Sequence, residues 1–139
     1  MIILDTNVIS EAMAIDPAEQ VMRWIRFAPR DELYTTAITE AEMRYGAARK
    51  SLHKKGGELE QIVDRIFIVR FAGRVLPFDG EAARELPAIL ISMQRDLRTY
   101  SRMDAFIAGI ARANSATIAI RNTADFERTG VPLVNPWTA

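Results

Sequence analysis

Four carboxylates stand where a parallel α/β fold would bring them together. Asp5 closes an apolar stretch at residues 2–4, while Glu42 and Asp104 each lie near the start of an expected helix, and Asp125 follows a late apolar stretch. Strand ends and helix starts meet at the carboxyl edge of a parallel sheet, so these acids can share one pocket. Because clustered carboxylates repel one another and a hard dication offsets that repulsion, the pattern predicts a magnesium or manganese site.

The same acids also have structural explanations. Thr39-x-x-Glu42 and Ser101-x-x-Asp104 match the capping-box pattern, in which the acid reaches back to an unsatisfied backbone N–H. Asp5 could cap the helix that follows it. A capping acid also points toward neighbouring helix starts, so the capping and metal-binding interpretations are compatible.

Polar residues beside the acids could orient them or contact a substrate; they are Thr6, Asn7, Arg121 and Asn122. Turn formation is the commoner role for asparagine, and Asp125 could close a short turn after Asn122. Arg121 could bind a phosphate, and a structural salt bridge is about as plausible.

Composition bounds the chemistry. The chain has 139 residues, which predicts one domain over 1–139. Cysteine is absent and His53 is the single histidine, so thiolate sites and multi-histidine zinc sites are excluded. No run of eighteen apolar residues and no signal-like segment is present, so we expect a cytoplasmic protein without a membrane span.

Net charge is zero and does not point to a nucleic-acid partner, but 15 of the 18 cations are Arg. Arg suits bidentate phosphate contacts. A local basic stretch runs through residues 44–55, for which a solvated helix face plus loop is the favoured explanation.

Short apolar segments alternate with helical patterns along the chain. Strands are expected at 2–4, 33–36, 75–78 and 117–120, with a candidate fifth strand at 133–135, and helices at 8–13, 17–27, from 39, 59–66, 79–98 and 101–114. This alternation predicts an α/β fold with a parallel sheet of four to five strands, covered by helices on both faces.

Four stretches resemble, in order and spacing, the PIN-domain ribonuclease toxins of the VapC group, in particular its FitB-like branch. They are IILDTNVISE (2–11), TEAEMRYG (39–46), MDAFIAGIA (103–111) and RNTADF (121–126). The likeness covers nearly the whole chain. It implies a compact PIN fold, RNA cleavage with Mg²⁺ or Mn²⁺, a homodimer, and inhibition by a VapB-like antitoxin.

By position, the resemblance implies that Asp5, Glu42 and Asp104 are the metal-binding acids, and that Asp125 is the fourth catalytic acid. Many relatives carry Asp where this chain has Asn122, and Thr where it has Ile120. Residues 97–100 replace a glycine-rich loop.

The expected mechanism is hydrolysis of an RNA phosphodiester by a metal-activated water, which leaves a 5′-phosphate and a 3′-hydroxyl. One alternative is a weakened PIN-fold protein that acts through dimerisation and antitoxin binding. Another is a haloacid-dehalogenase-like phosphatase with Asp5 as nucleophile, although that chemistry wants a second Asp where Asn7 stands.

Overall fold

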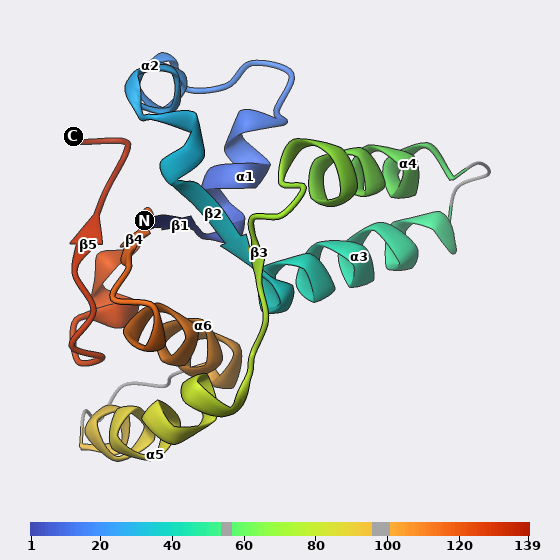
Figure 1. The fold of residues 1–139 in the computed structure, drawn as a ribbon. Helices are drawn as coiled ribbons and strands as arrows, with labels where there is room; N and C mark the ends of the chain where they lie inside the picture. Colours follow the sequence, from blue (N-terminus) through green and yellow to red (C-terminus); the bar gives the residue numbers. More distant parts are fainter. Residues whose placement is uncertain (54–56, 96–100) are drawn as a thin grey trace.

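The computed structural model describes residues 1–53, 57–95 and 101–139. Within them, five strands form one sheet in the order β3-β2-β1-β4-β5 (Figure 1). The strands are β1 Ile2–Leu4, β2 Leu33–Thr36, β3 Val75–Leu76, β4 Thr117–Ala119 and β5 Leu133–Val134. All neighbours pair in parallel, which confirms the predicted parallel sheet.

The strand β1 lies in the centre of the sheet. Ile3 is in register with Tyr34 of β2 on one side and with Ile118 of β4 on the other. The strand β3 is shorter than the expected 75–78, because Pro77 has no N–H to donate to a ladder. Because β1 pairs with β2 and β4, the residue that follows it, Asp5, lies between the ends of two neighbouring strands.

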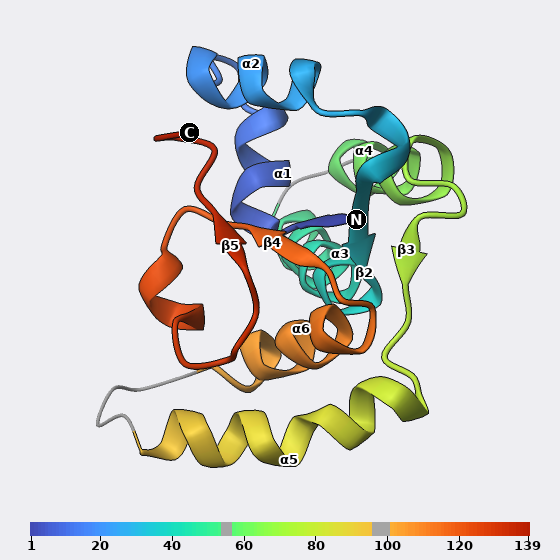
Figure 2. The same ribbon diagram turned by 60° about the vertical axis from the view of Figure 1, so that its left-hand side comes forward.

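Helices cover both faces of the sheet, as predicted (Figure 2). The α-helices are α1 Thr6–Ala12, α2 Glu19–Phe27, α3 Ala37–Ser51, α4 Glu58–Asp64, α5 Gly80–Gln94 and α6 Arg102–Ala113. Shorter segments are η1 Arg30–Glu32, the π-helical η2 Arg65–Arg70 and η3 Thr123–Phe126. In Figure 2, α5 and α6 lie on one side of the sheet, and α1 and α2 lie on the other. None of the helices in the described part is long and apolar enough to cross a membrane.

The core consists of two clusters, one on each side of the sheet. Successive strand residues point to opposite faces. Ile3 and Ile118 accordingly join the cluster formed with α5 and α6, which we call the first cluster. Leu4 and Ala119 join the second cluster, formed with α1, α2, α3, α4 and η2.

The start of α3 differs from the sequence-based expectation. The helix begins at Ala37, and Thr36 is its N-cap, with its hydroxyl accepting a hydrogen bond from the backbone N–H of Thr39 at 3.1 Å. The predicted capping box of Thr39 with Glu42 is therefore wrong. The hydroxyl that satisfies the free N–H belongs to the last residue of β2, which places Glu42 in the second turn of α3.

The other two predicted helix starts fare differently. Ser101 is the N-cap residue of α6, but its side chain makes no capping hydrogen bond. Asp79 caps α5 as expected, since its Oδ1 accepts from the N–H of Ala82 at 3.0 Å. The helix α5 continues through Pro87 to Gln94. The altered loop at 97–100 lies outside the described residues.

Candidate metal centre

The three acids of the expected metal site come from three different elements. Asp5 follows β1 as the N-cap residue of α1 and is 5% exposed. Glu42 lies in the second turn of α3, and Asp104 lies in the first turn of α6. The helices α3 and α6 contact each other, and the fold brings the three acids near enough for their charges to act on one another.

Asp104 is the electrostatic centre of this group. Burial and the nearby charges of Asp5, Asp125 and Glu42 together raise the pKa of Asp104 from 3.8 to about 7. Removing water disfavours the charged form, and each neighbouring carboxylate disfavours it further. The side chain is therefore poised to exchange a proton for a cation near neutral pH.

The other two acids respond to the same environment. The pKa of Asp5 is raised, first by burial and also by the charge of Asp125, while the backbone N–H groups of Thr6 and Asn7 act in the opposite direction. The pKa of Glu42 is raised by burial and then by Asp5. The charges of these side chains act on one another, as the sequence-based interpretation requires.

Asp125 belongs to the group, although its side chain is exposed. It lies in η3, just after β4, and its Oδ2 accepts a hydrogen bond from Nδ2 of Asn122 at 3.1 Å. The backbone N–H of Asp125 also donates to the carbonyl of Asn122 at 3.3 Å, which is the short turn foreseen from the sequence. Asn122 thus holds Asp125 in place.

The donors suit a hard dication by charge and by type. All are carboxylate oxygens, and no ion pair within the described residues engages Asp5, Glu42 or Asp104. Among the same residues, however, no three acidic or histidine side chains stand close enough to form a complete metal-ion site. The fit is therefore one of donor chemistry and accumulated negative charge, without a preformed coordination shell.

The polar residues singled out beside the acids take different positions. The hydroxyl of Thr6 is buried and has no hydrogen-bond partner among the described residues, whereas Asn7 is exposed in the first turn of α1. Arg121 lies over the ring of Trp137, 5.2 Å from its centroid, and forms no ion pair with a described acid. Of these, Thr6 is the group with unused hydrogen-bonding capacity next to Asp5.

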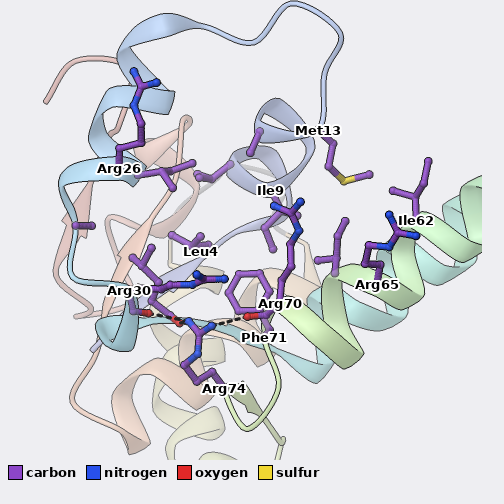
Figure 3. A pocket seen from close by; sticks show the side chains of 16 residues that line it. Leu4, Ile9, Met13, Arg26, Arg30, Ile62, Arg65, Arg70, Phe71 and Arg74 are labelled. Carbon is purple, nitrogen blue, oxygen red and sulfur yellow. Dashed lines mark hydrogen bonds between the residues drawn. The ribbon is translucent and has the colours of Figure 1, made fainter.

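Sequence reasoning missed a groove on the second-cluster side of the sheet (Figure 3). It has a volume of about 620 Å³ and an apolar floor that includes Leu4, Ile9 and Met13. Arginines from α2, η1, η2 and the position just before β3 surround it; they are Arg26, Arg30, Arg65, Arg70 and Arg74. The excess of Arg over Lys was the one signal in the sequence, but it could not say where the side chains gather.

Arg74 differs from the other arginines of the groove. It donates from Nη1 to the carbonyls of Arg30, at 2.8 Å, and Leu33, at 2.5 Å, and from Nη2 to that of Arg70 (dashed lines in Figure 3). It is thus a structural clamp between η1, β2 and η2. Its guanidinium is already engaged, whereas those of the other four form no ion pair with a described acid.

Comparison with known proteins places this architecture in a family, because a model of the PIN domain matches residues 2–132. The chain belongs to the PIN-domain family. This PIN-domain chain is 36% identical over 137 residues to the VapC ribonuclease Y4jK of Sinorhizobium fredii, covering 99% of this chain and 98% of the relative. It is also 36% identical over 137 residues to toxin FitB of Neisseria gonorrhoeae, covering 99% of each.

A solved structure agrees with the sequence relatives. The PIN-domain chain matches the crystal structure of FitAcB from Neisseria gonorrhoeae with a TM-score of 0.86 and 34% identity, over 100% of both chains. The resemblance to the VapC and FitB group of ribonuclease toxins is therefore confirmed, and so is the PIN fold. The phosphatase alternative falls away with this assignment.

Proposed function

We propose that this PIN-domain protein is the toxin of a VapBC-type toxin–antitoxin system and that it hydrolyses RNA with Mg²⁺ or Mn²⁺ held at the carboxylate group. The observation that carries the proposal is the electrostatic state of Asp104, whose pKa is raised to about 7 by burial and by three neighbouring acids. Such an accumulation of negative charge in a partly dry site favours a bound dication. Membership of a family that includes a VapC ribonuclease supplies the reaction class.

The residues take distinct roles in this proposal. Asp5 and Asp104 would bind the ion, and Glu42 would complete or orient its shell. Asp125, held by Asn122, adds negative charge and orients water beside the ion. A bound dication would supply a water of lowered pKa and offset the charge that develops on the phosphate.

The buried hydroxyl of Thr6 is available to hold a water or a phosphate oxygen next to Asp5. Because the attacking oxygen comes from water, the ribose 2′-hydroxyl is not needed. The products are then a 5′-phosphate and a 3′-hydroxyl.

The direct test is cleavage of total RNA by the purified protein in Mg²⁺. We expect cleavage by the wild-type protein, and its loss in Asp104→Asn or after chelation. Glu127→Gln, at an exposed acid that is not one of the four proposed site residues, is the matched control and should cut like wild type. Equal cleavage by all the samples, including the chelated one, would identify a contaminating nuclease and refute the proposal.

A second candidate function keeps the fold but not the chemistry. The absence of a preformed metal shell among the described residues favours a protein with weakened catalysis that acts through dimerisation and antitoxin binding. Titration of the purified protein with Mn²⁺ separates the two, because a weakened site binds little or no metal. Saturable binding that is lost in Asp104→Asn would exclude this candidate.

The groove of Figure 3 supports a VapB-like antitoxin as the partner. An amphipathic, acidic segment complements it, since apolar side chains match the floor and carboxylates match Arg26, Arg30, Arg65 and Arg70. Co-purification with the cognate antitoxin tests this fit. Arg70→Glu should weaken the complex, whereas Arg23→Glu, on the surface of α2 and paired with Glu19, should not.

Two further parts of the proposal concern assembly and location. We expect a homodimer, with a mass by light scattering of twice the 15.6 kDa of one chain. A toxin that cuts cellular RNA meets its substrate in the cytoplasm, which is therefore the proposed location.

A further inference from the structure

The proposed function leaves the exposed aromatic residue of α3 without a role. Tyr45 is 66% exposed, although aromatic side chains usually bury much of their surface. It follows Glu42 by three residues, so the two side chains lie on the same side of the helix. Arg49, one turn further on, places its guanidinium carbon 5.7 Å from the centroid of the tyrosine ring.

The packing of α3 shows which side of the helix this is. Ile38, one turn before Glu42 on the same side, packs against the first cluster, which contains α6. Met43 and Ala47 point instead into the second cluster. The stripe that contains Glu42, Tyr45 and Arg49 therefore leaves the carboxylate group on the α6 side and continues along the part of α3 that extends away from the sheet (Figure 1).

The three long cationic side chains of this part of α3 differ in whether they form ion pairs. Arg44 is bound to Glu40 on its own helix and to Asp64 of α4. Arg49 and Lys50 form no ion pair with any residue of 1–53, 57–95 or 101–139. Beyond Glu42, the stripe thus presents an exposed aromatic ring, with the guanidinium of Arg49 over it, and a positive charge that no described acid pairs with.

This combination fits a single-stranded nucleic acid better than a protein. Bases stack on aromatic side chains whatever their identity, and Arg binds the adjoining phosphate. Charged residues are depleted in the core of a protein interface, whereas the exposed Arg49 and Lys50 stand between Tyr45 and the exposed Leu52 at the end of α3. From Glu42 to Arg49 the helix rises by about 10 Å, which suits a nucleotide beside the one being cut.

We propose that Tyr45 and Arg49 form a subsite for single-stranded RNA, in which a base stacks on the ring and the guanidinium binds the adjacent phosphate. The proposal deepens the ribonuclease function proposed above and rests on it. It assigns to this face of α3 the task of holding the RNA strand on one side of the carboxylate group.

The test measures binding apart from cleavage. A fluorescently labelled single-stranded RNA is titrated with the full-length Asp104→Asn protein, and its anisotropy is recorded at several salt concentrations. Into this background we introduce Tyr45→Ala, Tyr45→Phe and Arg49→Ala, with Arg23→Ala on α2 as the matched control.

We expect Tyr45→Ala to weaken binding about tenfold, and Tyr45→Phe to bind within about twofold of the background because the stacking face remains. Arg49→Ala should weaken binding and lower the salt dependence by about one phosphate contact. Arg23→Ala should bind like the background.

Three outcomes would overturn the proposal. Equal RNA binding by the Tyr45→Ala protein and the background would remove the subsite while leaving the ribonuclease function intact. A change in the mass of Tyr45→Ala by light scattering would assign the ring to a contact between copies of the chain. No RNA binding by the background, together with no cleavage by the wild-type protein, would reject the subsite and the ribonuclease function together.

Discussion

Burial, and after it the charge of Asp5, raises the pKa of Asp104, although Asp5 follows the first strand and Asp104 lies in the first turn of the last long helix. The pair spans the two sides of the sheet, because α1 packs in the second cluster and α6 in the first. The electrostatic interaction between these two acids identifies the candidate site, which no single sequence motif does. Asp104 interacts in this way with all three other acids of the group.

The pKa of about 7 for Asp104 predicts that metal binding depends on pH. A proton and a cation compete for the same carboxylate, so the affinity for Mn²⁺ should rise as the pH increases through the neutral range. Calorimetric titrations at about one pH unit below and above neutrality would measure this change. An affinity that stays constant over this range would contradict the assigned proton.

Asp104→Asn should make the metal-free protein more stable at high pH. The folded-state pKa lies above the unfolded value of 3.8, so between these values the folded protein binds more protons and loses stability as the pH rises. Removing the charge should therefore stabilise the chain by about 1–2 kcal/mol above pH 7, a figure reduced for partial solvation. Urea unfolding in a chelator measures it, and the gain should vanish in acid, where the Asp is already protonated.

Thr36→Ala should destabilise the start of α3. The substitution removes the hydroxyl that accepts from the N–H of Thr39, at a cost of about 1 kcal/mol in the free energy of unfolding. Thr36→Ser keeps the acceptor and should lose clearly less. Equal losses in the two variants by urea unfolding would show that the lost methyl group matters and the cap does not.

Gly109→Ala and Gly46→Ala should have opposite effects on stability. A Cβ at Gly109 would lie 3.1 Å from the carbonyl oxygen of Ala82, so α5 and α6 would have to separate, at a cost of about 1–3 kcal/mol. A Cβ at Gly46 would meet nothing within 4 Å, and this helical position should gain roughly 0.4–1 kcal/mol. Thermal unfolding of the two variants tests the pair, and a loss at both positions would contradict the packing argument.

Arg74→Ala should be the most damaging arginine substitution around the groove. It leaves the carbonyls of Arg30, Leu33 and Arg70 without their donor, at a cost of roughly 1–3 kcal/mol. Arg74→Lys should recover little of this loss, because one ammonium cannot reproduce the fork of a guanidinium. Arg26→Ala is the control and should change the free energy of unfolding little, so a similar loss there would contradict the clamp.

The sequence was a good guide to the sheet, while the metal-binding role of the acids stays a prediction. Alternating apolar segments predicted the parallel strands, and the position of each acid after a strand or near a helix start predicted the group around Asp104. The capping pattern predicted the wrong N-cap for α3, because the tertiary structure decides between two threonines that are equally suitable by sequence. Thr36 and Thr39 are both good capping residues, and the end of β2 decided in favour of Thr36.

The groove and the stripe on α3 were beyond sequence reasoning for a related reason. The arginines of the groove come from α2, η1 and η2, and nothing in their spacing says that these segments meet. The tyrosine of the Glu42–Tyr45–Arg49 stripe reads in the sequence as part of a family motif. Only the packing of Met43 and Ala47 on the other side of α3 shows that its ring stays open.

The two separate clusters of the core have a consequence for how the molecule responds to its ion. Asp5 begins a helix on one side of the sheet, and Asp104 lies in a helix on the other side. A dication bound by both would therefore link the two sides and restrict their relative movement. Stripping it away should lower the melting temperature and quicken amide hydrogen exchange in α1 and α6 at the same time.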